Sequence, residues 1–127
     1  MKLIGYAKHL EHEKKLRSIL TTSLMKEQIK MIHSVNNLCI LLRVYPQESL
    51  IILLWISCRS EVTALNQHLD LLHLHTVVLI LPVCSREIVR HGHRLYPRFI
   101  GYSFENLRDV DVVVSRLIDR NHCFTLH

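Results

Sequence analysis

The feature that most constrains this fold is an unbroken apolar run, Leu50–Ile56, which has a serine at each end. A strand with one face in solvent would alternate apolar and polar residues. Because this run does not alternate, it predicts a strand over residues 50–57 that is covered on both faces, as in the centre of a parallel sheet. A second apolar run, Thr76–Leu81, is closed by Pro82 and predicts a neighbouring strand.

Strand and helix patterns alternate along the rest of the chain. Strands are expected at residues 2–7, 28–33, 50–57, 76–81 and 98–102. Apolar residues spaced three and four apart predict helices at 9–24, 35–43, 61–72, 85–91 and 105–119. Ser34, Ser60 and Ser85 are suitable N-caps, and Gly92 is suitable for closing the fourth helix.

This alternation predicts an α/β fold. At this length we expect a flavodoxin-like, five-stranded parallel sheet in the order 2-1-3-4-5, with helices on both faces. The 127 residues suit one domain, which we place at residues 1–121, followed by a C-terminal tail at 122–127.

Composition narrows the class of protein. The net charge of +5 favours acidic partners, but it makes nucleic acid an unlikely one without a basic groove or arm. The four cysteines are scattered and form no CxxC motif, which is typical of reduced thiols in a cytoplasmic protein. Charged residues between Lys8 and Lys15 interrupt the N-terminal segment, so we expect no secretory signal there. The apolar run at 50–56 is too short to span a membrane.

Two stretches carry a resemblance to a known family. They are Val78–Pro82 and Gly92–Phe99, followed by Arg108-Asp109-Val110. With the five strand–helix units, they resemble the receiver domain of bacterial two-component response regulators, and in particular a group of uncharacterised bacterial receiver-like proteins. The resemblance implies the fold predicted above and a role in signalling or protein interaction.

The chain departs from receivers where their phosphate chemistry takes place. The resemblance implies Mg²⁺-binding carboxylates after the first strand, a phosphate-accepting aspartate after the third, Ser or Thr after the fourth and lysine after the fifth. Those places hold Ala7-Lys8-His9, Ile56-Ser57-Cys58, Pro82-Val83-Cys84 and Tyr102-Ser103-Phe104. We therefore expect a pseudo-receiver that cannot undergo aspartyl phosphorylation, is not an enzyme and needs no cofactor.

A pocket is expected where the first, third and fourth strands end, since ligands of open α/β sheets bind there. Its residues would be Lys8, His9, Ser57, Cys58, Arg59, Cys84 and Ser85. The alternatives are a Zn²⁺ or thiol site, an anion site, or inert buried cysteines beside a surface histidine, and the inert reading is favoured. The pairs His73/His75 and His91/His93 are likewise read as loop or surface histidines, because no third metal ligand is visible.

Four arginines predict a binding face. Arg86, Arg90 and Arg94 are spaced by four on one helix face, and Arg98 lies just beyond it. The receiver resemblance implies that this face binds a protein partner or a second copy, together with the exposed side of the last helix, at Arg108, Asp111 and Arg116. The alternative is a solvated charged face. No small-molecule substrate is indicated.

Overall fold

The computed structural model describes residues 2–44, 49–83 and 85–125. Its centre is a five-stranded sheet in the order β2-β1-β3-β4-β5, in which every pair of neighbours is parallel. The strands are β1 (Lys2–Ala7), β2 (Ile29–Ile32), β3 (Leu50–Trp55), β4 (Thr76–Leu81) and β5 (Phe99–Tyr102). The predicted fold class and strand order are confirmed.

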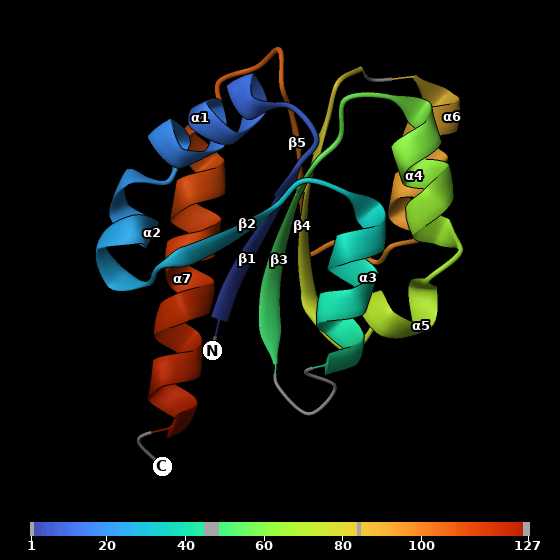
Figure 1. Cartoon of the computed structure of the whole chain (residues 1–127). Coiled ribbons are helices and arrows are strands. Elements are labelled where there is room, and N and C mark those ends of the chain that lie inside the picture. The colour runs from blue at the N-terminus through green and yellow to red at the C-terminus, as the bar shows by residue number, and fades with distance from the viewer. Residues whose placement is uncertain (1, 45–48, 84, 126–127) are drawn as a thin grey trace.

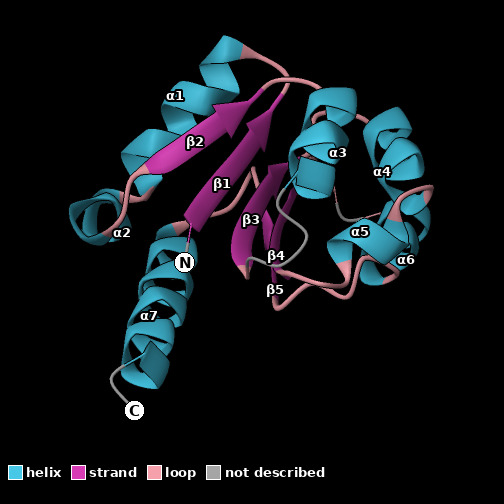
Figure 2. Cartoon of the chain, turned by 60° about the horizontal axis from the view of Figure 1, so that its bottom comes forward, coloured by secondary structure: helices cyan, strands magenta, loops and turns pink. Residues whose placement is uncertain are grey.

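Helices cover both faces of the sheet (Figure 1). They are α1 (Leu10–Ile19), α2 (Thr21–Lys26), α3 (Val35–Val44), α4 (Arg59–Asn66), α5 (Leu69–Leu72), α6 (Arg86–His93) and α7 (Arg108–Thr125). One face carries α1, α2 and α7, and the other carries α3 to α6 (Figures 1 and 2). No helix in the described part of the chain is long and apolar enough to cross a membrane.

Strand β3 lies at the centre, as its composition predicts. All six of its side chains are at most 3% exposed. Ile52 and Leu54 pack with helices α3 and α4, whereas Ile51 and Leu53 pack with α1 and α7. Because its side chains alternate between the two faces, β3 joins the two halves of the core. Each buried leucine or isoleucine contributes about 1.5–3 kcal/mol through removal of its side chain from water.

Two predicted helices are each divided in two. The predicted helix at 9–24 is interrupted at Leu20, whose ψ of 43° is not helical, and α2 begins immediately after it. The predicted helix at 61–72 begins earlier, at Arg59, with Cys58 rather than Ser60 as its N-cap. It ends at Asn66, because His68 leaves the helical region at φ −129°, and α5 follows as a separate turn.

The region around α6 corrects the expected role of Gly92. Ser85 is the N-cap, as predicted, and its Oγ accepts from the Ile88 N–H at 3.2 Å. Gly92 does not close the helix but lies within it, where an added Cβ would come within 2.9 Å of Leu79. Close packing against β4 therefore explains the glycine, and the left-handed residue after α6 is Tyr96, at φ 49°.

The last helix also differs from its predicted bounds. It begins at Arg108 instead of Glu105 and continues to Thr125, beyond the predicted end at Asp119. Residues 122–125 of the predicted tail are thus helical, and 126–127 lie outside the described residues.

Candidate functional site

The predicted site lies where β1 and β3 end. These two strands are neighbours in the sheet, but β1 leads into α1 on one face and β3 leads into α4 on the other (Figure 1). Such a divergence is the switch point at which open α/β sheets bind ligands. The side chains around this point decide which chemistry is available.

The central group at this point is the carboxylate of Glu61, in the first turn of α4. Its side chain is 5% exposed. Oε1 accepts from the backbone N–H groups of Ser57 and Cys58, at 3.0 and 3.2 Å, and from the Ser57 hydroxyl. Oε2 accepts from the hydroxyl of Tyr6 on β1. We call these four residues the Glu61 cluster; it joins β1, the end of β3 and the N-terminus of α4.

This arrangement is a capping box in which cysteine takes the usual place of serine or threonine. Cys58 is the N-cap of α4, and Glu61, three residues later, reaches back to the N–H of Cys58. The box supplies partners for amide groups that a helix start leaves free. Glu61 is therefore held by the fold, and both of its oxygen atoms are engaged.

The hydrogen bonds also fix the ionisation of the cluster. Burial alone would raise the pKa of Glu61, but the bonds from Ser57, Tyr6 and Cys58 outweigh it and lower that pKa below its usual range. Burial, reinforced by the bond to the Glu61 carboxylate, raises the pKa of the Tyr6 phenol. Around neutral pH the cluster thus holds one carboxylate and one neutral phenol.

An open cavity of about 240 Å³ lies beside the Glu61 cluster. Lys8 is the one described residue of the predicted pocket that lines it. The other lining residues come from β1, from His33 to Val35 at the start of α3, and from α4: Tyr6, His33, Ser34, Val35, Ser60, Glu61 and Ala64. The cavity therefore lies on the α3–α4 side of the switch point.

Of the remaining predicted pocket residues, Ser57 and Cys58 meet at Glu61, whereas the others contact different elements. His9 contacts the ring of His12 at 5.3 Å, on α1, while Cys58 is exposed at the start of α4. Arg59 forms an ion pair with Glu87 of α6, and Ser85 caps that helix. Cys84 lies outside the described residues.

The described residues contain no group of three or more His, Cys, Asp or Glu side chains placed to hold a metal ion. The members of the pair His73/His75 have separate partners. His73 donates from Nε2 to the Arg94 carbonyl at 3.2 Å, and Nδ1 of His75 accepts from the Leu50 N–H at 3.2 Å. His75 is thereby a structural group at the start of β3, and burial lowers its pKa.

The four predicted arginines of the binding face are exposed. We call Arg86, Arg90, Arg94 and Arg98 the arginine stripe. Within the described part of the chain none of them forms an ion pair, whereas Arg59 and Arg17 do. Arg108 and Arg116 of α7 are exposed as well.

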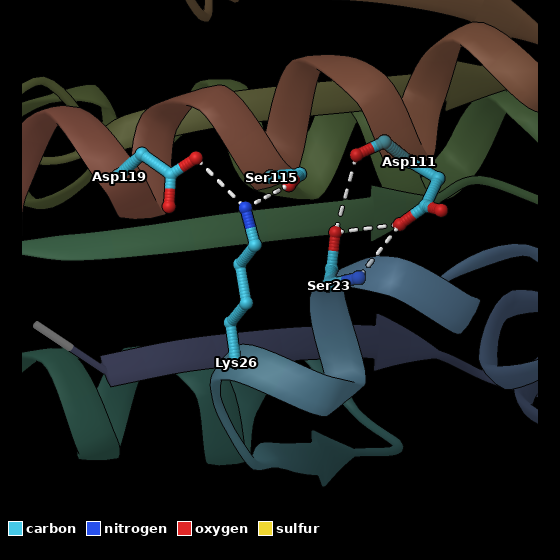
Figure 3. Close-up of polar contacts among 5 residues, drawn as sticks. All are labelled: Ser23, Lys26, Asp111, Ser115 and Asp119. Atoms are coloured by element: carbon cyan, nitrogen blue, oxygen red, sulfur yellow. Dashed lines mark hydrogen bonds and ion pairs between the residues drawn. The ribbon is translucent and has the colours of Figure 1, made fainter.

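Asp111 does not lie on the exposed side of α7, contrary to expectation. It is 9% exposed and faces α2, where its carboxylate accepts from the N–H groups of Thr22 and Ser23 at 3.0 and 2.9 Å. Figure 3 shows the bonds between Asp111 and Ser23. The Ser23 hydroxyl is 2.7 Å from Oδ1. Asp111 therefore caps α2 from a distant helix, and it is removed from the set of partner-binding residues.

A second contact extends this connection along α7. The ammonium group of Lys26 lies 2.7 Å from both Ser115 Oγ and Asp119 Oδ2 (Figure 3). Burial would raise the pKa of Asp111, but the bonds from Ser23 and Thr22 lower it below its usual range. Together Ser23, Lys26, Asp111, Ser115 and Asp119 form what we call the α2–α7 clasp.

Sequence reasoning missed both polar clusters. The Tyr6–Glu61 pair spans 55 residues and the Ser23–Asp111 pair spans 88. The only local signal was the Cys58-x-x-Glu61 spacing, a capping-box pattern that the cysteine conceals. No sequence signal marks Tyr6 or Asp111 as a partner.

Comparisons with known proteins agree on the fold. No protein-family model matches the chain, and no curated protein is similar to it in sequence. A solved structure of a protein from Burkholderia pseudomallei, described as pilus assembly-related, is similar with a TM-score of 0.71 and 11% identity, over 94% of this chain and 90% of that one. A CheY-like protein, TadZ, from Pseudomonas aeruginosa is similar with a TM-score of 0.67 and 15% identity, over 92% and 98%. At such identities the likeness establishes the fold, and the expected receiver-like fold is confirmed.

Proposed function

We propose that this protein is a non-catalytic, receiver-like interaction domain of the cytoplasm, which works without aspartyl phosphorylation and without a cofactor. One observation carries the proposal. Where a receiver needs free carboxylates, the structure has the Glu61 cluster, whose single carboxylate is already hydrogen-bonded through both oxygens. Phosphoryl transfer needs an accessible acceptor oxygen and carboxylates for Mg²⁺, whereas this lone carboxylate is 5% exposed and both of its oxygens already accept hydrogen bonds.

The residues at the strand ends support the same proposal. After β1 come Lys8 and His9, which are exposed and carry no carboxylate. After β3, Ile56 is fully buried and Ser57 donates to Glu61. A cation and a buried aliphatic group would both disfavour Mg²⁺ at this point.

An interaction role is supported by the exposed surface of α6 and α7. The arginine stripe is not neutralised by carboxylates of the described residues, and Arg108 and Arg116 add to the charge. Two apolar side chains nearby in sequence, Phe104 and Val112, are 62% and 44% exposed. Arginines interspersed with apolar groups are typical of protein-binding surfaces. The similar solved structures, one pilus assembly-related and one CheY-like, also favour a role in assembly or signalling.

The first experiment tests the loss of phosphotransfer. The protein is incubated with acetyl phosphate and Mg²⁺, and its intact mass is measured, with an active receiver domain as the positive control. We expect no mass gain of a phosphoryl group. Label on any aspartate or glutamate near residues 55–61 would refute the proposal.

The second experiment tests the surface. Sedimentation equilibrium is measured for the wild type, for Arg90→Glu with Arg94→Glu, and for a matched control, Lys14→Glu with Lys15→Glu on α1. We expect self-association that only the arginine variant weakens, because charge reversal removes the positive side chains that we propose contact the second copy. Equal behaviour of the two variants would count against the stripe as the interface.

A further inference from the structure

Two loops meet at the amino ends of β4 and β5, the opposite end of the sheet from the Glu61 cluster (Figure 2). The ring of His73, before β4, packs edge-on against the ring of Tyr96, before β5, at 4.7 Å. His73 also donates to the Arg94 carbonyl, and the Arg98 N–H donates to the Val77 carbonyl at 2.7 Å. The loops therefore form one connected surface.

This surface exposes two large apolar groups. Tyr96 is 75% exposed, and Leu74, next to His73 in the chain, is 61% exposed. Tyr96 also has φ 49°, in the left-handed region that costs a non-glycine residue about 1 kcal/mol. The backbone at Tyr96 is thus strained, and the strained residue carries an aromatic ring that lies in solvent. Glycine or asparagine would adopt this conformation at a lower energetic cost.

Positively charged residues flank Tyr96 in the sequence. Arg94 and Arg98 flank Tyr96 at two residues on either side, both exposed and without an ion pair among the described residues. We name His73, Leu74, Arg94, Tyr96 and Arg98 the edge cluster. Tyrosine and arginine are the residue types that most often dominate binding energy at protein interfaces.

We propose that the edge cluster binds an acidic segment of a partner protein. Arg94 and Arg98 pair with two of its carboxylates, and Tyr96 and Leu74 contact an apolar side chain between them. This inference rests on the proposed function, since Arg94 and Arg98 belong to the arginine stripe. It adds the chemistry of the partner and a docking point at the amino ends of the strands.

The charge and the aromatic content select this partner over two others. Single-stranded nucleic acid needs several aromatic side chains for base stacking, and the edge cluster has one tyrosine. A membrane surface needs a broad apolar helix face, whereas the edge cluster offers two exposed apolar side chains, both from loops. Acidic peptide is therefore the one occupant that matches both the arginines and the tyrosine.

The test measures fluorescence anisotropy with a labelled peptide of alternating glutamates and leucines. A glutamine version of the peptide, single-stranded oligo-dT of equal charge and vesicles with one-third phosphatidylserine are the comparison probes. The variants are Arg94→Glu with Arg98→Glu, Tyr96→Asn, and Arg86→Glu with Arg90→Glu; Lys14→Glu with Lys15→Glu is the charge control. Asparagine tolerates the left-handed backbone, so Tyr96→Asn removes the ring without disturbing the turn.

We expect the glutamate peptide to bind and the glutamine peptide, oligo-dT and vesicles to bind at least about tenfold more weakly. Arg94→Glu with Arg98→Glu should weaken peptide binding by about tenfold or more, and Tyr96→Asn by about fivefold at unchanged or raised thermal stability. Equal loss in the control pair, or no loss with Tyr96→Asn, would overturn the inference.

The remaining outcomes distinguish failure of the edge-cluster inference from failure of the proposed function. Tighter binding of oligo-dT or of vesicles than of the peptide would overturn the acidic partner while leaving the stripe as a binding face. Peptide binding that is lost in Arg86→Glu with Arg90→Glu but kept in both edge-cluster variants would overturn the edge cluster alone. Unchanged binding in all three variants would overturn the inference and count against the proposed function.

Discussion

The molecule contains two buried carboxylates that are structural for different reasons. Glu61 caps its own helix, α4, and receives one distant bond, from Tyr6. Asp111 caps a helix that precedes it by 88 residues, through Thr22 and Ser23 of α2. An acidic residue at the carboxyl edge of the sheet or on a helix can therefore serve the fold alone, and its hydrogen-bond partners distinguish this role from that of a ligand or a partner contact.

The largest loss of stability is expected at Glu61, which is more deeply buried than Asp111. Glu61→Ala should lower the free energy of unfolding by about 4 kcal/mol, because it leaves the buried Tyr6 hydroxyl and two partly buried amides without their acceptor. Urea denaturation measures this loss. Glu11→Ala, on the exposed surface of α1, is the control and should change stability by less than about 0.5 kcal/mol. A small loss in Glu61→Ala would show that water replaces the carboxylate.

Asp111→Ala should cost about 2 kcal/mol, since it removes a helix cap and the partner of the buried Ser23 hydroxyl. Hydrogen exchange should become faster in α2 and remain unchanged in β3, whose protection reports the whole fold. Asp109→Ala, an exposed acidic residue two positions earlier, is the matched control. If exchange in α2 were equally slow in both variants, Asp111 would not be its cap.

Tyr6→Phe tests the contact between β1 and α4 in the Glu61 cluster. It deletes one hydroxyl that donates to Glu61 and should cost about 1.5 kcal/mol. In a double-mutant cycle with Glu61→Gln, the two losses should fall short of additivity by about 1 kcal/mol. Strict additivity would contradict direct coupling between β1 and α4.

The pH dependence distinguishes the carboxylates from the histidine. Glu61 and Asp111 have lowered pKa values in the fold, so their stabilisation is complete above their ordinary values of 4.5 and 3.8 and is lost as pH falls through the lowered ones. His75, half-buried, has a lowered pKa as well, so its contribution to stability begins to fade as the pH falls below 6.5. Urea midpoints between pH 7 and 3 should fall in two stages, and His75→Gln should reduce the first, to which His12, whose pKa is also lowered by burial, contributes as well.

The smallest effect is expected at the exposed end of the α2–α7 clasp. Lys26→Met should cost about 0.5 kcal/mol, because Asp119 is 60% exposed and solvent screens the pair. Thermal unfolding at low and at high salt measures it, and the difference from wild type should shrink at high salt. A loss as large as that of Asp111→Ala would mean that the clasp acts as one cooperative unit.

The parts of the structure that the sequence predicts are those with local causes. The uniform apolar composition of β3 placed it at the centre, and Ser85 was identified as the cap of α6 from its position alone. The break at Leu20 could not be predicted, because the cap that starts α2 comes from Asp111. For the same reason Asp111 was misplaced on the exposed side of α7.

The candidate site likewise has a part that can be predicted from local sequence and a part that depends on distant contacts. Absence of receiver carboxylates after β1 and β3 can be read directly from Lys8, Ser57 and Cys58. The engagement of Glu61 by Tyr6 depends on the alignment of β1 beside β3, which brings Tyr6 opposite Leu54. Only the folded sheet reveals that the remaining carboxylate at this edge is already occupied.

The most direct test of the central claim is a titration with beryllium fluoride and Mg²⁺, which mimics an aspartyl phosphate, followed by amide NMR. We expect no saturable shifts at residues 7–9 or 57–61, since the carboxylate of Glu61 is held by Tyr6, Ser57 and Cys58. Saturable shifts centred on Glu61 would show that a free acceptor exists at this edge and would contradict the central claim.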